Sequence, residues 1–147
     1  MQVPRNSLVL VADGGRFSLY RNAGSALLPD LQLITERGQH IADAADLGSD
    51  QPGRSFSSTG SRRNTYEATD FHRLAEDRLA GEAITVLDSQ VEKFPGCVIV
   101  VAAPKTLGTM RRSYSDRITK HLIGEIDKDY ADRSAREVEK ALMTWEA

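Results

Sequence analysis

The beginning of the chain consists of short apolar runs separated by turn residues. Residues 7–12 (SLVLVA) are apolar, and the sequence DGGR at residues 13–16 follows them directly. Glycine-rich turns of this kind join antiparallel strands, so residues 17–21 are predicted to form the returning strand of a hairpin. Apolar and polar residues then alternate over residues 31–35. This alternation predicts a third strand, and with it a three-stranded meander.

The pattern changes to helical spacing after residue 69. Apolar residues recur at intervals of three or four over residues 71–91, and Thr69 or Asp70 is a suitable N-cap for a helix that ends at the Pro-Gly pair of residues 95–96. Residues 97–103 (CVIVVAA) are the most continuously apolar segment of the chain. Such a segment is typical of a central strand that is covered on both faces.

The last third of the chain predicts two more helices and one more strand. Residues 104–120 follow helical spacing with Thr106 as the predicted N-cap, and the inward stripe consists of Leu107, Met110, Tyr114 and Ile118. Residues 121–126 (HLIGEI) predict a strand, with a helix extension as the alternative. Ser134 and Glu137 have the spacing of a capping box, which predicts the start of a final helix.

The order of these elements predicts an α/β fold for a single domain spanning residues 1–147. Three strands come first, a long loop follows, and helices then alternate with strands. Strands that are followed by α/β crossovers indicate a mixed sheet of roughly five strands flanked by helices.

The segment from about residue 38 to residue 69 has little periodicity and is predicted to be one long flexible loop. Its second half, GRSFSSTGSRRNTYEAT at residues 53–69, contains three arginines and no acidic residue before Glu67. Arginine binds phosphates bidentately, and an aromatic face can stack on a base. The alternative interpretation is a surface loop without a ligand. The candidate contacts to RNA or a partner in this segment are Arg54, Gly60, Arg62, Arg63 and Tyr66.

Cations also cluster at the two helices that follow. His72 and Arg73 fall in the first turn of the long predicted helix, where His72 could act as an acid or base or contact a phosphate. The next predicted helix, residues 104–120, has Lys105 at its start and contains Arg111 and Arg112, with Asp116 as its only acidic residue. These five residues join the candidate binding set, with a solvated helix surface as the alternative.

Composition limits the possible functions. The 147 residues carry a net charge of −2, so any affinity for a polyanion must come from a local patch. The single cysteine excludes an internal disulfide and a cysteine-rich zinc site. Neither a signal peptide nor an apolar run long enough to span a membrane is visible, which predicts a soluble, cytoplasmic protein. The predicted first strand (residues 7–12) and central strand (residues 97–103) carry no carboxylates, so we expect no metal-dependent nuclease centre and no cofactor.

Four segments resemble the host attachment proteins, a bacterial family that is grouped with release-factor-like domains. They are LVLVADGGRFSLYRN, YEATDFHRLAEDRLAGEA, VVAAPKTLGTMRRSYSD and IGEIDKDYADRSAREVEKAL, and together they span nearly the whole chain in order. The resemblance implies a ribonuclease-H-like sheet similar to the middle domain of archaeal and eukaryotic peptide-chain release factors. In those factors a Gly-Gly-Gln tip before the long helix helps to hydrolyse peptidyl-tRNA. Residues 59–63 of this chain read TGSRR instead.

The missing glutamine argues against peptide release, while the position of the basic loop argues for retained binding. The first hypothesis is therefore a non-catalytic, release-factor-like module that binds RNA or the ribosome through its basic loop. The alternative is a protein-interaction factor in bacterial surface attachment or its regulation, without nucleic-acid binding. A third is a hydrolase that uses His72 or the loop.

Overall fold

The computed structural model describes residues 1–38 and 61–145, and within these ranges it leaves the side chains of residues 61–72 undescribed. The described elements are β1 (Leu8–Ala12), β2 (Arg16–Asn22), β3 (Leu31–Gly38), α2 (Ser61–Lys93), β4 (Val98–Ala102), α3 (Pro104–Arg111), α4 (Asp116–His121), β5 (Leu122–Ile126) and α5 (Ala135–Thr144).

The strands form one mixed sheet in the order β3-β2-β1-β4-β5. The first three strands pair antiparallel, as the predicted meander requires, whereas β1, β4 and β5 run parallel. Every residue of β1 and of β4 is buried, because helices cover both faces of the sheet at these strands. The predicted fold class, an α/β domain with a five-stranded mixed sheet, is confirmed.

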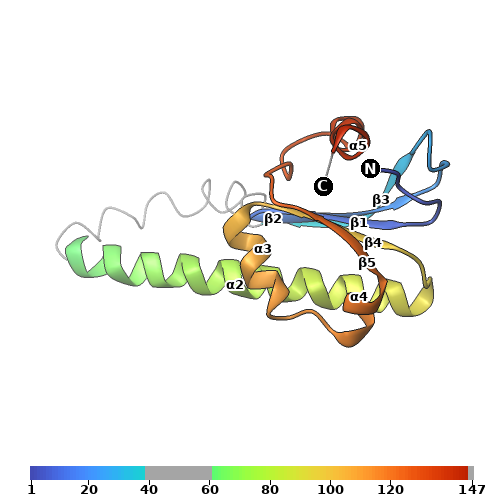
Figure 1. Ribbon diagram of the computed structural model, residues 1–147. Coiled ribbons are helices and arrows are strands. Elements are labelled where there is room, and N and C mark those ends of the chain that lie inside the picture. The colour runs from blue at the N-terminus through green and yellow to red at the C-terminus, as the bar shows by residue number, and fades with distance from the viewer. Residues whose placement is uncertain (39–60, 146–147) are drawn as a thin grey trace.

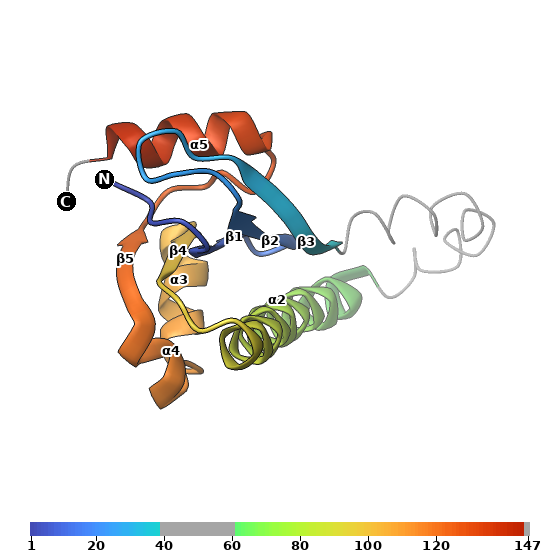
Figure 2. The same cartoon turned by 90° about the vertical axis from the view of Figure 1, so that its right-hand side faces the viewer.

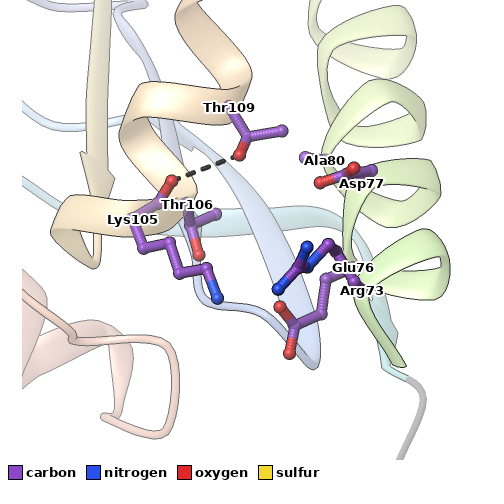
Figure 3. A pocket seen from close by; sticks show the side chains of 7 residues that line it. All are labelled: Arg73, Glu76, Asp77, Ala80, Lys105, Thr106 and Thr109. Carbon is purple, nitrogen blue, oxygen red and sulfur yellow. Dashed lines mark hydrogen bonds between the residues drawn. The ribbon is translucent and has the colours of Figure 1, made fainter. Parts of the chain in front are cut away.

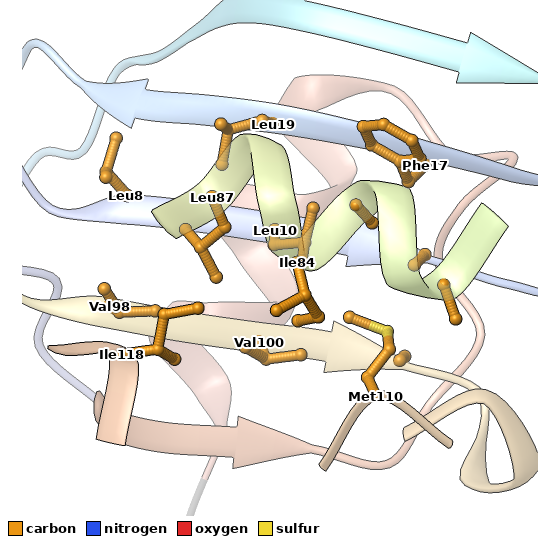
Figure 4. Close-up of a cluster of buried hydrophobic side chains, with 14 of the residues drawn as sticks. Leu8, Leu10, Phe17, Leu19, Ile84, Leu87, Val98, Val100, Met110 and Ile118 are labelled. Atoms are coloured by element: carbon orange, nitrogen blue, oxygen red, sulfur yellow. The ribbon is translucent and has the colours of Figure 1, made fainter. Parts of the chain in front are cut away.

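The helices lie in two layers on opposite faces of the sheet. Figure 1 shows α2, α3 and α4 below the sheet and α5 above it, and Figure 2 shows the same arrangement after a quarter turn. The larger apolar cluster lies between the sheet and α2, and we call it the cluster under α2. In it, Ile84 and Leu87 pack against strand residues such as Leu10 (Figure 4). A second cluster, which we call the cluster under α5, lies between the sheet and α5, where Val138 and Leu142 are buried. Both clusters share the central strands of the sheet.

Helix α2 begins earlier than its sequence predicts. The prediction placed its N-cap at Thr69 or Asp70, but the helix begins at Ser61. Residues 61–69 (SRRNTYEAT) contain neither glycine nor proline, and adding residues to an existing helix costs far less than starting one. The predicted loop is therefore too long at its C-terminal end. Its remaining part, residues 39–60, lies outside the described residues.

The single helix predicted for residues 104–120 is two helices. Helix α3 begins at Pro104, so Ala103 is the N-cap and Thr106 lies within the first turn. Proline suits the first helical position, because its missing N–H would have no partner there. Ser115 caps α4 by accepting a hydrogen bond from the N–H of Ile118. Its hydroxyl also donates to Asp88 of α2 at 2.6 Å, which ties α4 to α2.

Helix α5 is fixed at both of its ends. Its N-terminus has the predicted capping box of Ser134 and Glu137. At its C-terminus, the ammonium group of Met1 donates hydrogen bonds to the carbonyls of Leu142 and Trp145, at 2.8 and 2.7 Å. None of the described helices is both long and apolar enough to cross a membrane.

Candidate functional site

A hollow lies between α2 and α3, at the edge of the sheet where β1 and β4 end. We call it the α2–α3 groove. It is small, with a volume of about 20 Å³, and its lining residues are Arg73, Glu76, Asp77, Ala80, Lys105, Thr106 and Thr109. Figure 3 shows the side chains of Arg73 and Lys105 extending into the gap from the two helices. The fold thus brings together two predicted cations that are far apart in the sequence.

The groove has a mixed electrostatic character. Glu76 and Asp77 of α2 line it together with the two cations, so its formal charges balance. The hydroxyl of Thr109 donates to the carbonyl of Lys105 at 3.3 Å, within the first turns of α3. A phosphate entering the groove would be attracted by Arg73 and Lys105 but would also approach two carboxylates. The groove alone is therefore a weak anion site.

The β1–β2 turn packs against the same part of α2. A Cβ atom added at Gly14 would lie 3.0 Å from the carboxylate of Glu76, so glycine permits this close approach. One carboxylate oxygen of Asp13 accepts hydrogen bonds from the N–H groups of Gly15 and Arg16, at 2.7 and 2.9 Å. Asp13 therefore stabilises the turn. The described residues contain no group of three or more potential metal ligands.

Some of the other predicted binding residues belong to α2, and others lie outside the described part of the chain. Arg54 and Gly60 lie outside the described residues. Arg62, Arg63, Tyr66 and His72 belong to the N-terminal half of α2, so the first three are helical positions and not loop positions. Figure 1 shows this half of the helix extending past the sheet.

The burial pattern of α2 agrees with this projection. The described side chains from Arg73 to Arg78 are exposed or half-buried, and burial in the core begins at Leu79. At 1.5 Å per residue, the segment from Ser61 to Arg78 is about 27 Å long. Helix α2 therefore carries Arg62, Arg63, Tyr66 and His72 on a segment that extends away from the core.

The two arginines at the end of α3 differ in their surroundings. Arg111 donates to both carboxylate oxygens of Glu125 on β5, with its Nη2 2.9 Å from Oε1. The hydroxyl of Tyr114 donates to the same carboxylate at 2.6 Å. Arg112 is exposed. The predicted basic surface is therefore smaller than the sequence indicates, because Arg111 already has a partner.

Electrostatic effects in this cluster follow from its contacts. The hydrogen bonds from Arg111, and then from Tyr114, lower the pKa of Glu125 despite its partial burial. Burial raises the pKa of Tyr114, and the hydrogen bond to Glu125 raises it further. The cluster consequently stays ionised at Arg111 and Glu125 and protonated at Tyr114 near neutral pH. We interpret it as a structural link between α3 and β5.

Sequence reasoning missed the acidic residues of the groove. Arg73, Glu76, Asp77 and Ala80 are three or four positions apart, and this spacing places them on one side of a helix. That signal was available in the sequence. What the sequence did not indicate is that this side of α2 meets the start of α3, because the meeting depends on how both helices pack on the sheet.

Comparison with known proteins gives one family match. Residues 6–142 match the family described as bacterial archaeo-eukaryotic release factor family 12. No curated protein matches the chain. Among solved structures, the ethanolamine utilization protein EutJ from Carboxydothermus hydrogenoformans has a TM-score of 0.41 and 12% identity, over 86% of this chain and 47% of that protein. The chain thus spans about half the length of that protein. The family match includes all five described strands.

Proposed function

This chain belongs to bacterial archaeo-eukaryotic release factor family 12, and we propose that it is a non-catalytic module that binds RNA, on the ribosome or free. The proposed contact surface is the N-terminal half of α2 together with the α2–α3 groove. The observation that supports the proposal is that the N-terminal half of α2, which contains four of the candidate contact residues, extends past the sheet, while a fifth, Arg73, lines the same groove as Lys105.

The chemistry of this surface suits a phosphate backbone. Arg62 and Arg63 are adjacent on α2 and would place two guanidinium groups near the far end of the helix. Tyr66 follows one turn later and offers an aromatic face for a base. Arg73 and Lys105 add two more cations where the helix reaches the body of the domain. Residues 61–78 also carry four acidic side chains, Glu67, Asp70, Glu76 and Asp77, so the proposed phosphate contacts come from individual cations and not from a uniformly basic surface.

The proposal does not include peptide release. The chain contains no Gly-Gly-Gln sequence, and its only Gly-Gln pair is Gly38-Gln39, of which Gly38 is the last residue of β3. We therefore infer that binding is retained without the reaction of the release factors. A role in surface attachment remains the alternative, and it would require binding to a protein instead.

Co-sedimentation with ribosomes tests the proposal. The wild-type chain is centrifuged with ribosomes, and titrated separately with a single-stranded RNA, at about 50 and about 500 mM KCl. We expect binding that weakens steeply with salt. The double variant Arg62→Ala/Arg63→Ala removes two phosphate contacts. It should make the negative slope of log K against log salt shallower by about 1.4 for a single strand.

A matched double variant controls for net charge. Arg136 and Lys140 are exposed residues of α5, on the opposite face of the sheet. Arg136→Ala/Lys140→Ala removes the same charge and should leave binding unchanged. Absence of any binding at low salt, to ribosomes and to RNA alike, would reject the proposal in favour of a protein-interaction role. Equal losses in both double variants would show that only net charge matters.

A further inference from the structure

Strand β3 forms one edge of the sheet and presents apolar side chains to solvent. It is the longest described strand, with eight residues, and it pairs with β2 on one side only within the described part of the chain. Leu33 is 49% exposed and Ile34 is 37% exposed. A long edge strand with exposed apolar side chains is a template for pairing with another strand.

A bulge in β3 determines which side chains share a face. Leu33 lies opposite Tyr20 and Thr35 lies opposite Leu19, so Ile34 is an additional residue. Before the bulge, Leu31 faces the cluster under α5. After the bulge, odd-numbered positions face the other way, which the ion pair between Arg37 and Glu82 of α2 shows.

We propose that β3 pairs antiparallel with β3 of a second copy of this chain, with Leu33 opposite Ile34 across a two-fold axis. This register places Gln32 opposite Thr35, Leu31 opposite Glu36 and Asp30 opposite Arg37 of the second copy. The bulge puts the two members of each pair on the same face of the combined sheet. The pairing would join the two five-stranded sheets into one continuous sheet across the two-fold axis.

The sequence of β3 is complementary to itself in this register. The centre is apolar, an amide and a hydroxyl flank it, and opposite charges meet at both ends, so that only the pair of Leu31 with Glu36 lacks matching chemistry. The neighbouring register that pairs Leu33 with itself places Asp30 opposite Glu36, and two like charges in that position are destabilising. A two-fold interface uses the same edge on both copies, so the association stops at a dimer. These features indicate a second copy as the occupant of the edge.

One hydrogen bond must be exchanged for this pairing to form. The N–H of Leu31 donates to the carboxylate of Glu139 on α5 at 2.8 Å in the single chain. In the dimer, the same N–H would donate to a backbone carbonyl of the second copy. Because this N–H already has a partner in the single chain, the dimer gains less from the new hydrogen bond than it would from an unpaired N–H. We therefore expect association that depends on concentration.

Sedimentation equilibrium of the full chain, without nucleic acid, tests the proposal over about 5 to 500 µM. The wild-type chain should shift from monomer to dimer within this range. Leu33→Lys introduces a charge at the centre of the pairing and should weaken association at least about tenfold. Leu74→Lys is the matched control, because Leu74 is an exposed leucine of α2. It should leave association unchanged, and circular dichroism should show both variants folded.

A charge exchange tests the register. Asp30→Arg and Arg37→Asp should each weaken association about fivefold, because each places like charges together at both ends of the pairing. The double variant should return association to within about twofold of wild type, even though it also loses the ion pair of Arg37 with Glu82. A wild-type chain that stays monomeric at the highest concentration would overturn the proposal. So would a dimer that Leu33→Lys does not affect, or a double variant as weak as the single ones.

Discussion

At the scale of single residues, Asn22 shows how a buried polar side chain can organise a loop. It is fully buried at the end of β2. Its amide nitrogen donates to the carbonyls of Val3 and Ser25, at 2.8 and 3.2 Å. Its oxygen accepts from the N–H groups of Gly24 and Asp30, both at 2.9 Å. One side chain therefore holds the β2–β3 connection and the N-terminal segment together.

We expect Asn22→Ala to lower the free energy of unfolding by about 3 kcal/mol, because it leaves several backbone groups without partners. Chemical denaturation of both proteins measures the difference. Gln32→Ala is a control, since Gln32 is an exposed amide whose side chain donates to Asp30. It should change stability by less than about 0.5 kcal/mol. Similar losses in the two variants would contradict the role assigned to Asn22.

A second residue-scale prediction concerns pH and Glu125. Because its pKa is lower in the folded chain than in the unfolded chain, the ionised carboxylate stabilises the fold. This stabilisation is complete above the ordinary carboxyl pKa of about 4.3 and is lost as the pH falls toward the lowered value. Glu125→Gln should therefore cost about 1 kcal/mol at pH 7. Denaturation at pH 7 and below pH 4 should show the difference shrinking; a constant difference would contradict the prediction.

At the scale of elements, the two halves of α2 contribute differently to stability. Leu87 is fully buried between α2 and the sheet, whereas Leu74 lies in the N-terminal half of α2 and is 59% exposed. Leu87→Ala should lower the free energy of unfolding by about 3 kcal/mol through lost burial and a cavity. The same substitution at Leu74 should change it by less than about 0.5 kcal/mol. Thermal and urea denaturation of the two variants would compare identical changes in one helix. Equal losses would show that the N-terminal half of α2 is packed in solution.

The sequence predicted those elements that have strong periodicity. The strands were recognised from short apolar runs and the turn at residues 13–16, and the capping box of Ser134 and Glu137 marked the start of α5. The start of α2 was predicted too late, because its first residues carry few apolar side chains. The break between α3 and α4 was missed because the apolar spacing from Leu107 to Ile118 is also compatible with a continuous helix.

The candidate site was less predictable because it depends on tertiary packing. Arg73 and Lys105 were identified as cations near helix starts, but their convergence follows from α2 and α3 meeting at one edge of the sheet. The partner of Arg111 is Glu125 on β5, a contact set by the sheet order and not by helical spacing. Charge patterns along a sequence therefore overestimate a binding surface when strands supply unseen partners.

At the scale of the whole molecule, one sheet supports both apolar clusters. Strands β1 and β4 contribute Leu10 and Val100 to the cluster under α2, and Val9 and Val101 to the cluster under α5. Loss of either cluster would expose one apolar face of strands that also support the other cluster. This shared sheet indicates that the two faces unfold together.

Trp145 makes this cooperativity measurable. It is the only tryptophan of the chain, and it packs against the cluster under α5. Its fluorescence therefore reports on that face, while far-UV circular dichroism reports mainly on α2, the longest described helix. We expect the two signals to give the same urea midpoint and the same slope, as a two-state transition requires. If fluorescence changed at a lower urea concentration than circular dichroism, α5 would detach first and the sheet would remain folded against α2, α3 and α4. Leu142→Ala, which removes a buried contact of α5, should shift both signals equally, because a defect on one face destabilises the sheet that both faces share.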